Sequence, residues 1–285
     1  MTYVVLGASG HVGAAVVAAL RSAGESVLAV VHDPSKAAPL EAQGAEVAVV
    51  DVGDPGALHA VIARGTRAFL LNPPADIGGD TDAAELGTAR AIGAALREAG
   101  LEKVVVASTY GAQPGDAIGD LSTLCKFERL VSANGIPTAT NRGAYYFTNF
   151  DQLLEPAKQG TLPTMFPADM ALPMVAPADL GAAAARRLRS GVDDVGVHYV
   201  EGPRRYSFND VAAIFSTVLG LQITVATIPR EGWEAAYREQ GFSDAAARAY
   251  VRMTAATIDQ GPASPDDPER GSTTLDQHIR ALVAG

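Results

Sequence analysis

Short apolar segments alternate with alanine-rich segments through the first half of the chain. Each apolar segment is rich in β-branched residues and is bounded by turn residues, which is the pattern of a buried strand. The alanine-rich segments carry apolar residues at helical spacing, so strands and helices are expected to alternate. The expected strands are Tyr3–Leu6, Ser26–Val31, Glu46–Val50, Arg67–Leu71, Lys103–Ala107 and Pro137–Asn141.

Strands that are joined through helices run parallel, and strands without polar alternation are covered on both faces. Residues 1–150 are therefore predicted to form an α/β domain with a doubly wound parallel sheet. After residue 150, prolines break the chain into short pieces, so residues 151–285 are expected to form a smaller mixed C-terminal lobe, partly interwoven with the first domain. Its expected strands are 196–201 and 221–228, its expected helices are 178–190, 208–219, 245–257 and 275–283, and Asp259–Ser272 is expected to be a loop.

Composition and charge exclude several classes of protein. Hydrophobic residues make up 48% of the 285 residues and charged residues 19%, which is too apolar for a disordered chain. The 22 basic and 32 acidic side chains give a formal charge of −10, so direct nucleic-acid binding is not expected. The single cysteine, Cys125, excludes an internal disulfide and favours a reducing compartment. Without a basic leader or a long apolar run, the chain is expected to be cytoplasmic and away from membranes.

A glycine-rich loop follows the first strand directly and opens the first helix. It has the pattern G-x-x-G-x-x-G in the strand-loop-helix context that gives such a pattern meaning. Glycines permit the tight turn and let the backbone approach a pyrophosphate, which the helix N-terminal amides then receive. We therefore predict dinucleotide binding, with His11 contacting phosphate or solvent rather than acting as a base. The loop residues expected at the cofactor are Gly7, Ser9, Gly10, His11, Val12 and Gly13.

The end of the second strand decides between NAD and NADP, because an acid there binds the ribose hydroxyls and a cation binds the 2′-phosphate. His32 and Lys36 can supply positive charge, whereas Asp33 favours the unphosphorylated ribose. The last apolar position, Val31, carries no acid. The balance favours NADP, with NAD as the alternative.

Two residues after the third strand are candidates for contact with the adenine. Asp51 could accept a hydrogen bond from the adenine amino group while Val52 packs on the ring. The alternative for Asp51 is an ordinary N-cap of the helix that begins near Pro55.

Further segments follow the glycine loop in a characteristic order. They are His32–Lys36, Lys126–Leu130, Ile136–Gly143, Val175–Gly181, Tyr199–Pro203 and Arg270–Ile279. In this order the chain resembles, over nearly its whole length, the NmrA-like branch of the atypical short-chain dehydrogenases. These are NAD(P)-binding Rossmann proteins that include triphenylmethane-dye reductases, quinone reductases and cofactor-sensing regulators.

The resemblance implies where the nicotinamide half of the cofactor lies. It places the loop after the fourth strand, containing Leu71, Asn72, Pro73 and Pro74, along that half of the molecule. Arg commonly occupies the position of His32 in this family and contacts the 2′-phosphate. The change to His weakens the preference for NADP and makes phosphate binding pH-sensitive.

The resemblance also implies contacts at the nicotinamide ribose and ring. Ser108 and Thr109 would lie beside that ribose, and Lys126 would hydrogen-bond its hydroxyls. The backbone around Arg142 and Gly143 would flank the carboxamide.

The usual proton donor of short-chain dehydrogenases is missing. A tyrosine normally lies four residues before the lysine, but Ser122 stands at that position before Lys126, and a serine hydroxyl is too weak an acid to replace it. Tyr110, Tyr145 and Tyr146 are alternative donors, although such tyrosines are more often pocket wall.

Hydride transfer needs no side-chain acid when the acceptor delocalises the added electrons, as a quinone or a cationic dye does. We therefore expect an NAD(P)H-dependent reductase of a small conjugated acceptor that works without flavin or metal. The alternative is a non-catalytic NAD(P)-binding sensor that reports redox state to a protein partner, and epimerase action on a nucleotide sugar is a weaker third interpretation. The five histidines lack zinc-ligand spacing, and no Gly-x-Ser-x-Gly segment indicates a hydrolase.

Overall fold

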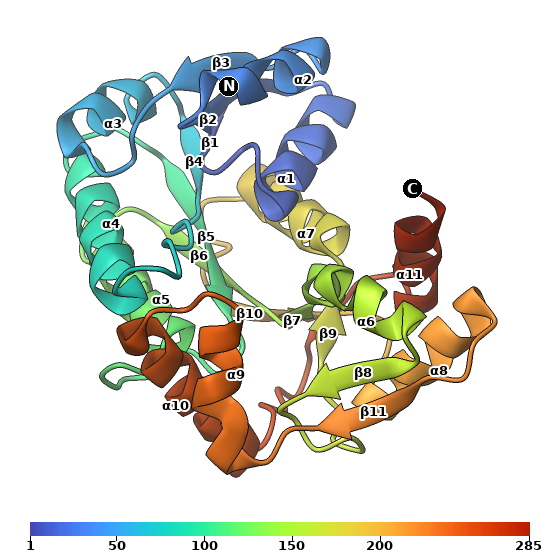
Figure 1. Cartoon of the computed structure of the whole chain (residues 1–285). Coiled ribbons are helices and arrows are strands. Elements are labelled where there is room, and N and C mark those ends of the chain that lie inside the picture. The colour runs from blue at the N-terminus through green and yellow to red at the C-terminus, as the bar shows by residue number, and fades with distance from the viewer.

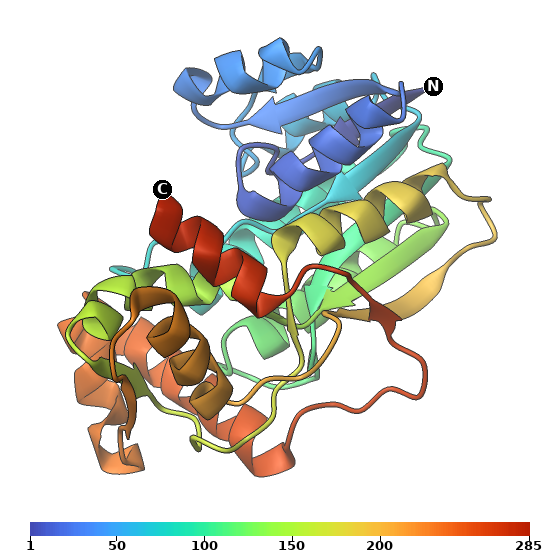
Figure 2. The same ribbon diagram turned by 90° about the vertical axis from the view of Figure 1, so that its right-hand side faces the viewer.

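A parallel sheet of eight strands runs through the centre of the computed structural model, which describes all 285 residues (Figures 1 and 2). Every strand pairs parallel with its neighbours. In order across the sheet the strands are β12 (Glu269–Arg270), β10 (Gly196–Glu201), β6 (Thr138–Gly143), β5 (Lys103–Thr109), β4 (Arg67–Leu70), β1 (Thr2–Val5), β2 (Ser26–Val31) and β3 (Glu46–Val49). The six strands expected from the first half of the sequence and the doubly wound α/β class are confirmed.

Helices cover both faces of this sheet (Figure 1). On one face, α1 (His11–Ser22) and α7 (Pro177–Arg189) bury apolar side chains of β1, β2 and β5. On the other face lie α3 (Pro55–Ile62), α4 (Thr81–Ala95) and α5 (Asp120–Ser132). The short η1 (Pro34–Lys36) and α2 (Ala37–Ala42) connect β2 to β3. None of the helices is long and apolar enough to cross a membrane.

Helices α1 and α7 touch at very small residues. A Cβ added to Gly181 would lie 2.4 Å from the Cβ of Ala15, so the two helices approach as closely as their backbones allow. Because α7 comes from the second half of the chain, this contact packs that half against α1, the helix that follows the glycine loop.

A second apolar core, around Phe147, Phe150 and Phe215, lies among most of the remaining elements. They occupy the lower part of Figure 1. They are β7 (Tyr145–Tyr146), η2 (Phe147–Leu153), α6 (Leu154–Lys158), β8 (Thr161–Thr164), β9 (Met174–Val175), α8 (Phe208–Leu219), β11 (Thr224–Thr227), η3 (Arg230–Gly232), α9 (Trp233–Glu239), α10 (Asp244–Gln260) and α11 (Leu275–Ala284).

The expectation of a loop over Asp259–Ser272 is wrong at both ends. Helix α10 continues to Gln260, and Glu269–Arg270 forms the edge strand β12. The strand exists because its backbone pairs with β10 and Arg270 Nη2 lies 2.8 Å from a carboxylate oxygen of the buried Glu201. Local sequence does not contain this information, because the partner is about 70 residues away.

A cluster of charged side chains, formed by Lys103, Arg187 and Asp194, lies at the amino ends of the central strands. Lys103 is fully buried and its Nζ donates to Ser190 Oγ and to the Gly191 carbonyl, both at 2.8 Å. Asp194 accepts hydrogen bonds from Arg187 and lies 3.6 Å from Lys103 Nζ. Partial burial opposes ionisation of Asp194, but hydrogen bonds from Arg187 and Ser190 prevail and lower the pKa of this carboxyl to about 2. This group ties the end of α7 to β5 and β6.

Candidate functional site

The glycine loop has the geometry of an anion-binding turn. Gly7 has a φ of +65°, a left-handed conformation that favours glycine, and the amide of Gly10 donates to the Gly7 carbonyl at 3.0 Å. Gly10 is the N-cap of α1 and has no side chain to cap the helix. The first turn of α1 also contains no acidic residue, so its amides and the positive end of its dipole remain available to a phosphate.

Gly13 lets the first turn of α1 pack directly against the glycine loop. A Cβ at this position would lie 2.1 Å from the Gly7 carbonyl oxygen, which no side chain can accommodate. A Cβ at Gly10 would meet only that same oxygen, at 3.4 Å, and the residue is exposed. Gly13 is therefore required for packing of the loop, whereas Gly10 leaves open space where a pyrophosphate can approach.

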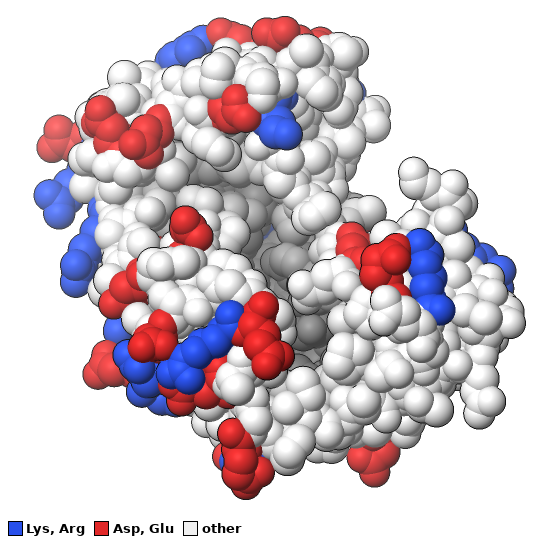
Figure 3. Space-filling model, viewed as in Figure 1, with Lys and Arg blue, Asp and Glu red and all other residues white.

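A cavity of about 440 Å³ opens beside the glycine loop, at the carboxyl ends of β1, β2 and β4. Figure 3 shows a hollow in the middle of this face, with the charged side chains gathered mainly on its rims and on the outer surface. The residues lining the cavity are Gly7, Ser9, Val30, Val31, His32, Asp51, Val52, Leu71, Pro73 and Pro74. Val30 and Val31 were not predicted to contact the cofactor, because they look like any other apolar strand residues.

The polar side chains that follow β2 differ in whether they face the cavity. His32 lines the cavity, but Asp33 does not. The Asp33 carboxylate accepts hydrogen bonds from the amide and hydroxyl of Ser35, at 2.9 and 2.7 Å, and these bonds lower the pKa of Asp33. The acid that would favour an unphosphorylated ribose is therefore used to cap η1. Lys36 is exposed and does not line the cavity.

Asp51 lies at the cavity and does not cap a helix. Its Oδ1 accepts from the Gly53 amide at 2.8 Å, which leaves its second carboxylate oxygen free. The N-cap of α3 is Asp54, which accepts from the amides of Gly56 and Ala57. The geometry leaves Asp51 available for an adenine amino group.

Other residues assigned to the glycine loop or its surroundings lie outside this cavity. His11 is exposed at the first position of α1, and Val12 lines a small void against Tyr146 instead. Asn72 is buried, and its amide donates to the Glu85 carbonyl at 3.1 Å, so its side chain is directed at α4.

The residues expected around the nicotinamide ribose gather at the ends of β5 and β6. Thr109 and Gly143 are register partners there. The Ser108 hydroxyl donates to Glu128 at 2.5 Å, and Arg142 forms a two-pronged ion pair with the same carboxylate. Hydrogen bonding by Glu128 raises the pKa of Arg142. The side chains of Ser108 and Arg142 are thus bound to Glu128 of α5. A ligand at this place would contact the backbone of these two residues.

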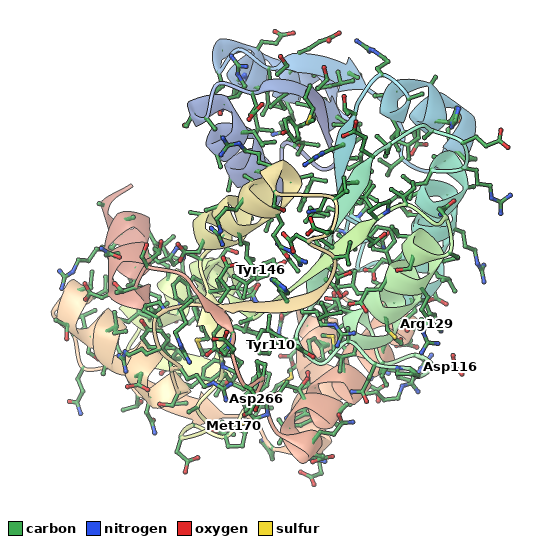
Figure 4. All side chains as sticks on the ribbon, turned by 180° about the vertical axis from the view of Figure 1, so that it is seen from behind. Tyr110, Asp116, Arg129, Tyr146, Met170 and Asp266 are labelled. Atoms are coloured by element: carbon green, nitrogen blue, oxygen red, sulfur yellow. The ribbon has the colours of Figure 1, made fainter.

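Lys126 projects from α5 toward Asp116, with Nζ 3.0 Å from a carboxylate oxygen. Asp116 lies near the outer edge of the molecule in Figure 4. The Asp116 side chain is 97% exposed, and such pairs contribute little, so the ammonium group can exchange this partner for a ribose hydroxyl. Ser122 cannot replace the missing tyrosine, because it is buried and donates to the Gly119 carbonyl.

The three tyrosines that are candidate proton donors do not line the cavity beside the glycine loop. Figure 4 places Tyr110 and Tyr146 in the middle of the molecule. Tyr110 donates to Glu201 at 3.2 Å, and burial and that carboxylate raise its pKa. Burial also raises the pKa of Tyr145 and of Tyr146 to about 12. All three phenols therefore stay protonated near neutral pH, as hydrogen-bond donors and very weak acids.

Comparison with known proteins identifies the family of the chain. Residues 1–256 match the NmrA-like family. The chain belongs to the NmrA-like family. It is 24% identical to quinone oxidoreductase 2 of Escherichia coli over 242 residues, which cover 84% of this chain and 82% of that protein. It is 23% identical to the NAD(P)H azoreductase of Xenophilus azovorans over 251 residues, 88% of this chain and 85% of that protein.

Solved structures of two reductases have the same fold as this chain. The triphenylmethane reductase of Citrobacter sp. superimposes with a TM-score of 0.83 at 20% identity, and all of both chains is covered. An NADPH-dependent quinone oxidoreductase of Escherichia coli, crystallised with NADPH, superimposes with a TM-score of 0.82 at 22% identity over 99% of this chain and 100% of that chain. The expected family and the Rossmann fold are therefore confirmed.

Proposed function

We propose that this NmrA-like protein is an NADPH-dependent reductase that transfers hydride to a small conjugated acceptor such as a quinone or a dye. The observation that carries the proposal is the cavity beside the glycine loop, which His32 lines and from which Asp33 is turned away. Relatives named as quinone oxidoreductase, azoreductase and triphenylmethane reductase support the acceptor class. The acceptor lies, in this proposal, between the central sheet and the part of residues 151–285 that packs around Phe150 and Phe215.

Bound NADPH supplies the hydride, and the chain orients it. The α1 amides and Ser9 hold the pyrophosphate, His32 the 2′-phosphate, and Asp51 the adenine. Lys126 binds the nicotinamide ribose. Preorganised placement of the acceptor against the nicotinamide ring is then the main contribution of the protein.

A single buried cysteine is compatible with action in the cytoplasm.

One observation supports a second candidate function. Ser122 replaces the expected tyrosine and is bound to the Gly119 carbonyl, so the usual acid of dehydrogenases in this superfamily is absent. A non-catalytic NAD(P)-binding regulator with a protein partner needs no such acid.

A turnover assay separates the two functions. The purified protein is mixed with NADPH and a panel of quinones and cationic dyes, and absorbance of the reduced nicotinamide is followed. Saturable oxidation of one NADPH per acceptor reduced is expected. Tight NADPH binding without oxidation by any acceptor would instead support the regulator.

Substitution of His32 tests the cofactor preference. Arg at position 32 keeps a permanent charge beside the cavity and can hold a phosphate with two hydrogen bonds. We expect His32→Arg to tighten NADPH binding about tenfold and to change NADH binding little. Calorimetric titration with both cofactors checks this, and equal gains for both would remove His32 from the phosphate site.

A further inference from the structure

Two adjacent prolines, Pro73 and Pro74, form part of the wall of the cavity beside the glycine loop. They belong to residues 72–75, the diproline segment, which begins two residues after β4 ends. Leu71 lines the same cavity and also reaches the glycine loop, because a Cβ added to Gly7 would lie 3.1 Å from Leu71 Cδ2. A dinucleotide whose pyrophosphate lies at the glycine loop would therefore pass along the diproline segment.

The diproline segment is stiff but is not held by its own backbone. Each proline fixes its φ angle, restricts the conformation of the residue before it and has no amide hydrogen to donate. Residues 72–75 lie outside every helix and strand and make no backbone–backbone hydrogen bond. The segment therefore moves nearly as one unit, and its position depends on what holds its two ends.

Glu85 of α4 holds both ends of the diproline segment. The side-chain amide of Asn72 donates to the Glu85 carbonyl at 3.1 Å, and the backbone amide of Ala75 donates to Glu85 Oε1 at 3.3 Å. No other hydrogen bond joins residues 72–75 to the rest of the chain. Glu85 is 4% exposed, and its Oε2 accepts from Thr123 Oγ1 of α5 at 3.0 Å. One buried residue thus connects the cavity wall to two helices.

We propose that Glu85 is a positioning residue that clamps the diproline segment and thereby preorganises the cavity for a dinucleotide. This inference rests on the proposed function, because it concerns the same cavity. Glu85 does not line the cavity and acts only through the segment that does. Without the clamp, the segment has to be ordered when the cofactor binds, and this loss of conformational freedom reduces the binding free energy.

The clamp works in either protonation state of Glu85. Burial, followed by the charge of Asp120, raises the pKa of Glu85 to about 7. A protonated Oε2 can donate to Thr123, whose hydroxyl has the Gly119 carbonyl as a second acceptor at 3.4 Å, while Oε1 still accepts from Ala75. A glutamine at position 85 reproduces this protonated form, because its amide group can donate to Thr123 and accept from Ala75.

Calorimetric titration with NADPH tests the clamp. Glu85→Leu removes the acceptor of the Ala75 amide, and we expect NADPH binding to weaken about tenfold. Glu85→Gln should stay within about twofold of the unsubstituted chain. Asn72→Ala cuts the other end of the clamp and should also weaken NADPH binding, which keeps the test available if Glu85→Leu does not fold. Unchanged affinity in Glu85→Leu and Asn72→Ala would overturn the proposal.

Asp194→Ala is the control for stability alone. Its charged cluster with Lys103 and Arg187 contributes no residue to the lining of the cavity. This variant should unfold more easily than the unsubstituted chain but should bind NADPH with unchanged affinity while it is folded. Equal losses of affinity in Glu85→Leu and Glu85→Gln, or losses that follow stability in all variants, would show that Glu85 has only a structural role.

Hydrogen exchange of the cofactor-free protein detects the clamp without any turnover. We expect the Ala75 amide to exchange about tenfold faster in Glu85→Leu than in the unsubstituted chain, and Glu85→Gln to exchange like the latter. The same exchange rate in Glu85→Leu and the unsubstituted chain would overturn the clamp. Failure of the unsubstituted chain to bind NADPH would refute the proposed function instead, and the exchange of Ala75 would still decide whether Glu85 holds the segment.

Discussion

Gly10→Leu is expected to abolish useful NADPH binding while leaving the protein folded. Gly10 has φ −85° and ψ 169°, a conformation that any residue adopts, and it is exposed. A leucine side chain would therefore fit the free protein but occupy the space in front of the α1 amides, where the pyrophosphate must lie. We expect binding to weaken at least ~100-fold, or about 3 kcal/mol of binding free energy. Calorimetric titration with NADPH measures the loss, and circular dichroism checks the fold.

Gly13→Ala is the matched comparison, because it changes the same loop for a different physical reason. The added methyl group would overlap the Gly7 carbonyl oxygen, so the loop itself must move. This variant should lose thermal stability as well as NADPH affinity, whereas Gly10→Leu should lose affinity alone. Retained affinity in Gly10→Leu would show that the dinucleotide does not bind at this loop.

Asp194→Ala is expected to be the most destabilising single change outside the apolar cores. It leaves the fully buried Lys103 and the buried Arg187 without their shared carboxylate. Because the Asp194 side chain is 27% exposed, the expected loss lies at the lower end of the about 3–5 kcal/mol that breaking a buried ion pair costs. Denaturant unfolding measures the difference in free energy of unfolding. The neighbouring exposed Asp193→Ala is the control and should change stability by less than about 0.5 kcal/mol.

The same carboxylate predicts a pH dependence. The folded-state pKa of Asp194 is about 2, below its ordinary value of 3.8. Its stabilising contribution is therefore complete above the unfolded pKa and is lost as the pH falls from about 4 toward 2. Asp194→Ala should lack this part of the acid sensitivity. An identical acid transition in the variant and the unsubstituted chain would contradict the assignment.

The sequence predicted the first half of the fold well because local patterns control it. Strands such as Ser26–Val31 are continuous apolar segments, and crossover helices require them to run parallel. The glycine loop is equally local, since Gly7 and Gly13 serve a turn and a contact within seven residues. The short edge strand at Glu269–Arg270 could not be predicted, because it depends on pairing with β10 and on Glu201.

The candidate site also contains some residues that the sequence predicts and others that it does not. His32 and Asp51 follow strands directly, and strand ends in a parallel sheet meet at one edge, so their presence at one cavity follows from the pattern. The sequence could not show that the Asp33 carboxylate binds Ser35, because Asp33 lies in the same turn as His32 and Lys36 and either sign of charge could face the cofactor. Glu85 gives no local signal at all. It looks like an exposed helix residue, and its burial arises only when α5 and α10 pack over the start of α4.

Single turnover of the NADPH complex tests the central claim most directly. The protein is saturated with NADPH deuterated at the transferring position of nicotinamide C4, and a quinone is added without oxygen. We predict oxidation of one bound NADPH per chain, with a primary deuterium isotope effect on that step and no flavin signal. Bound NADPH that remains reduced in the presence of every quinone and dye would contradict it.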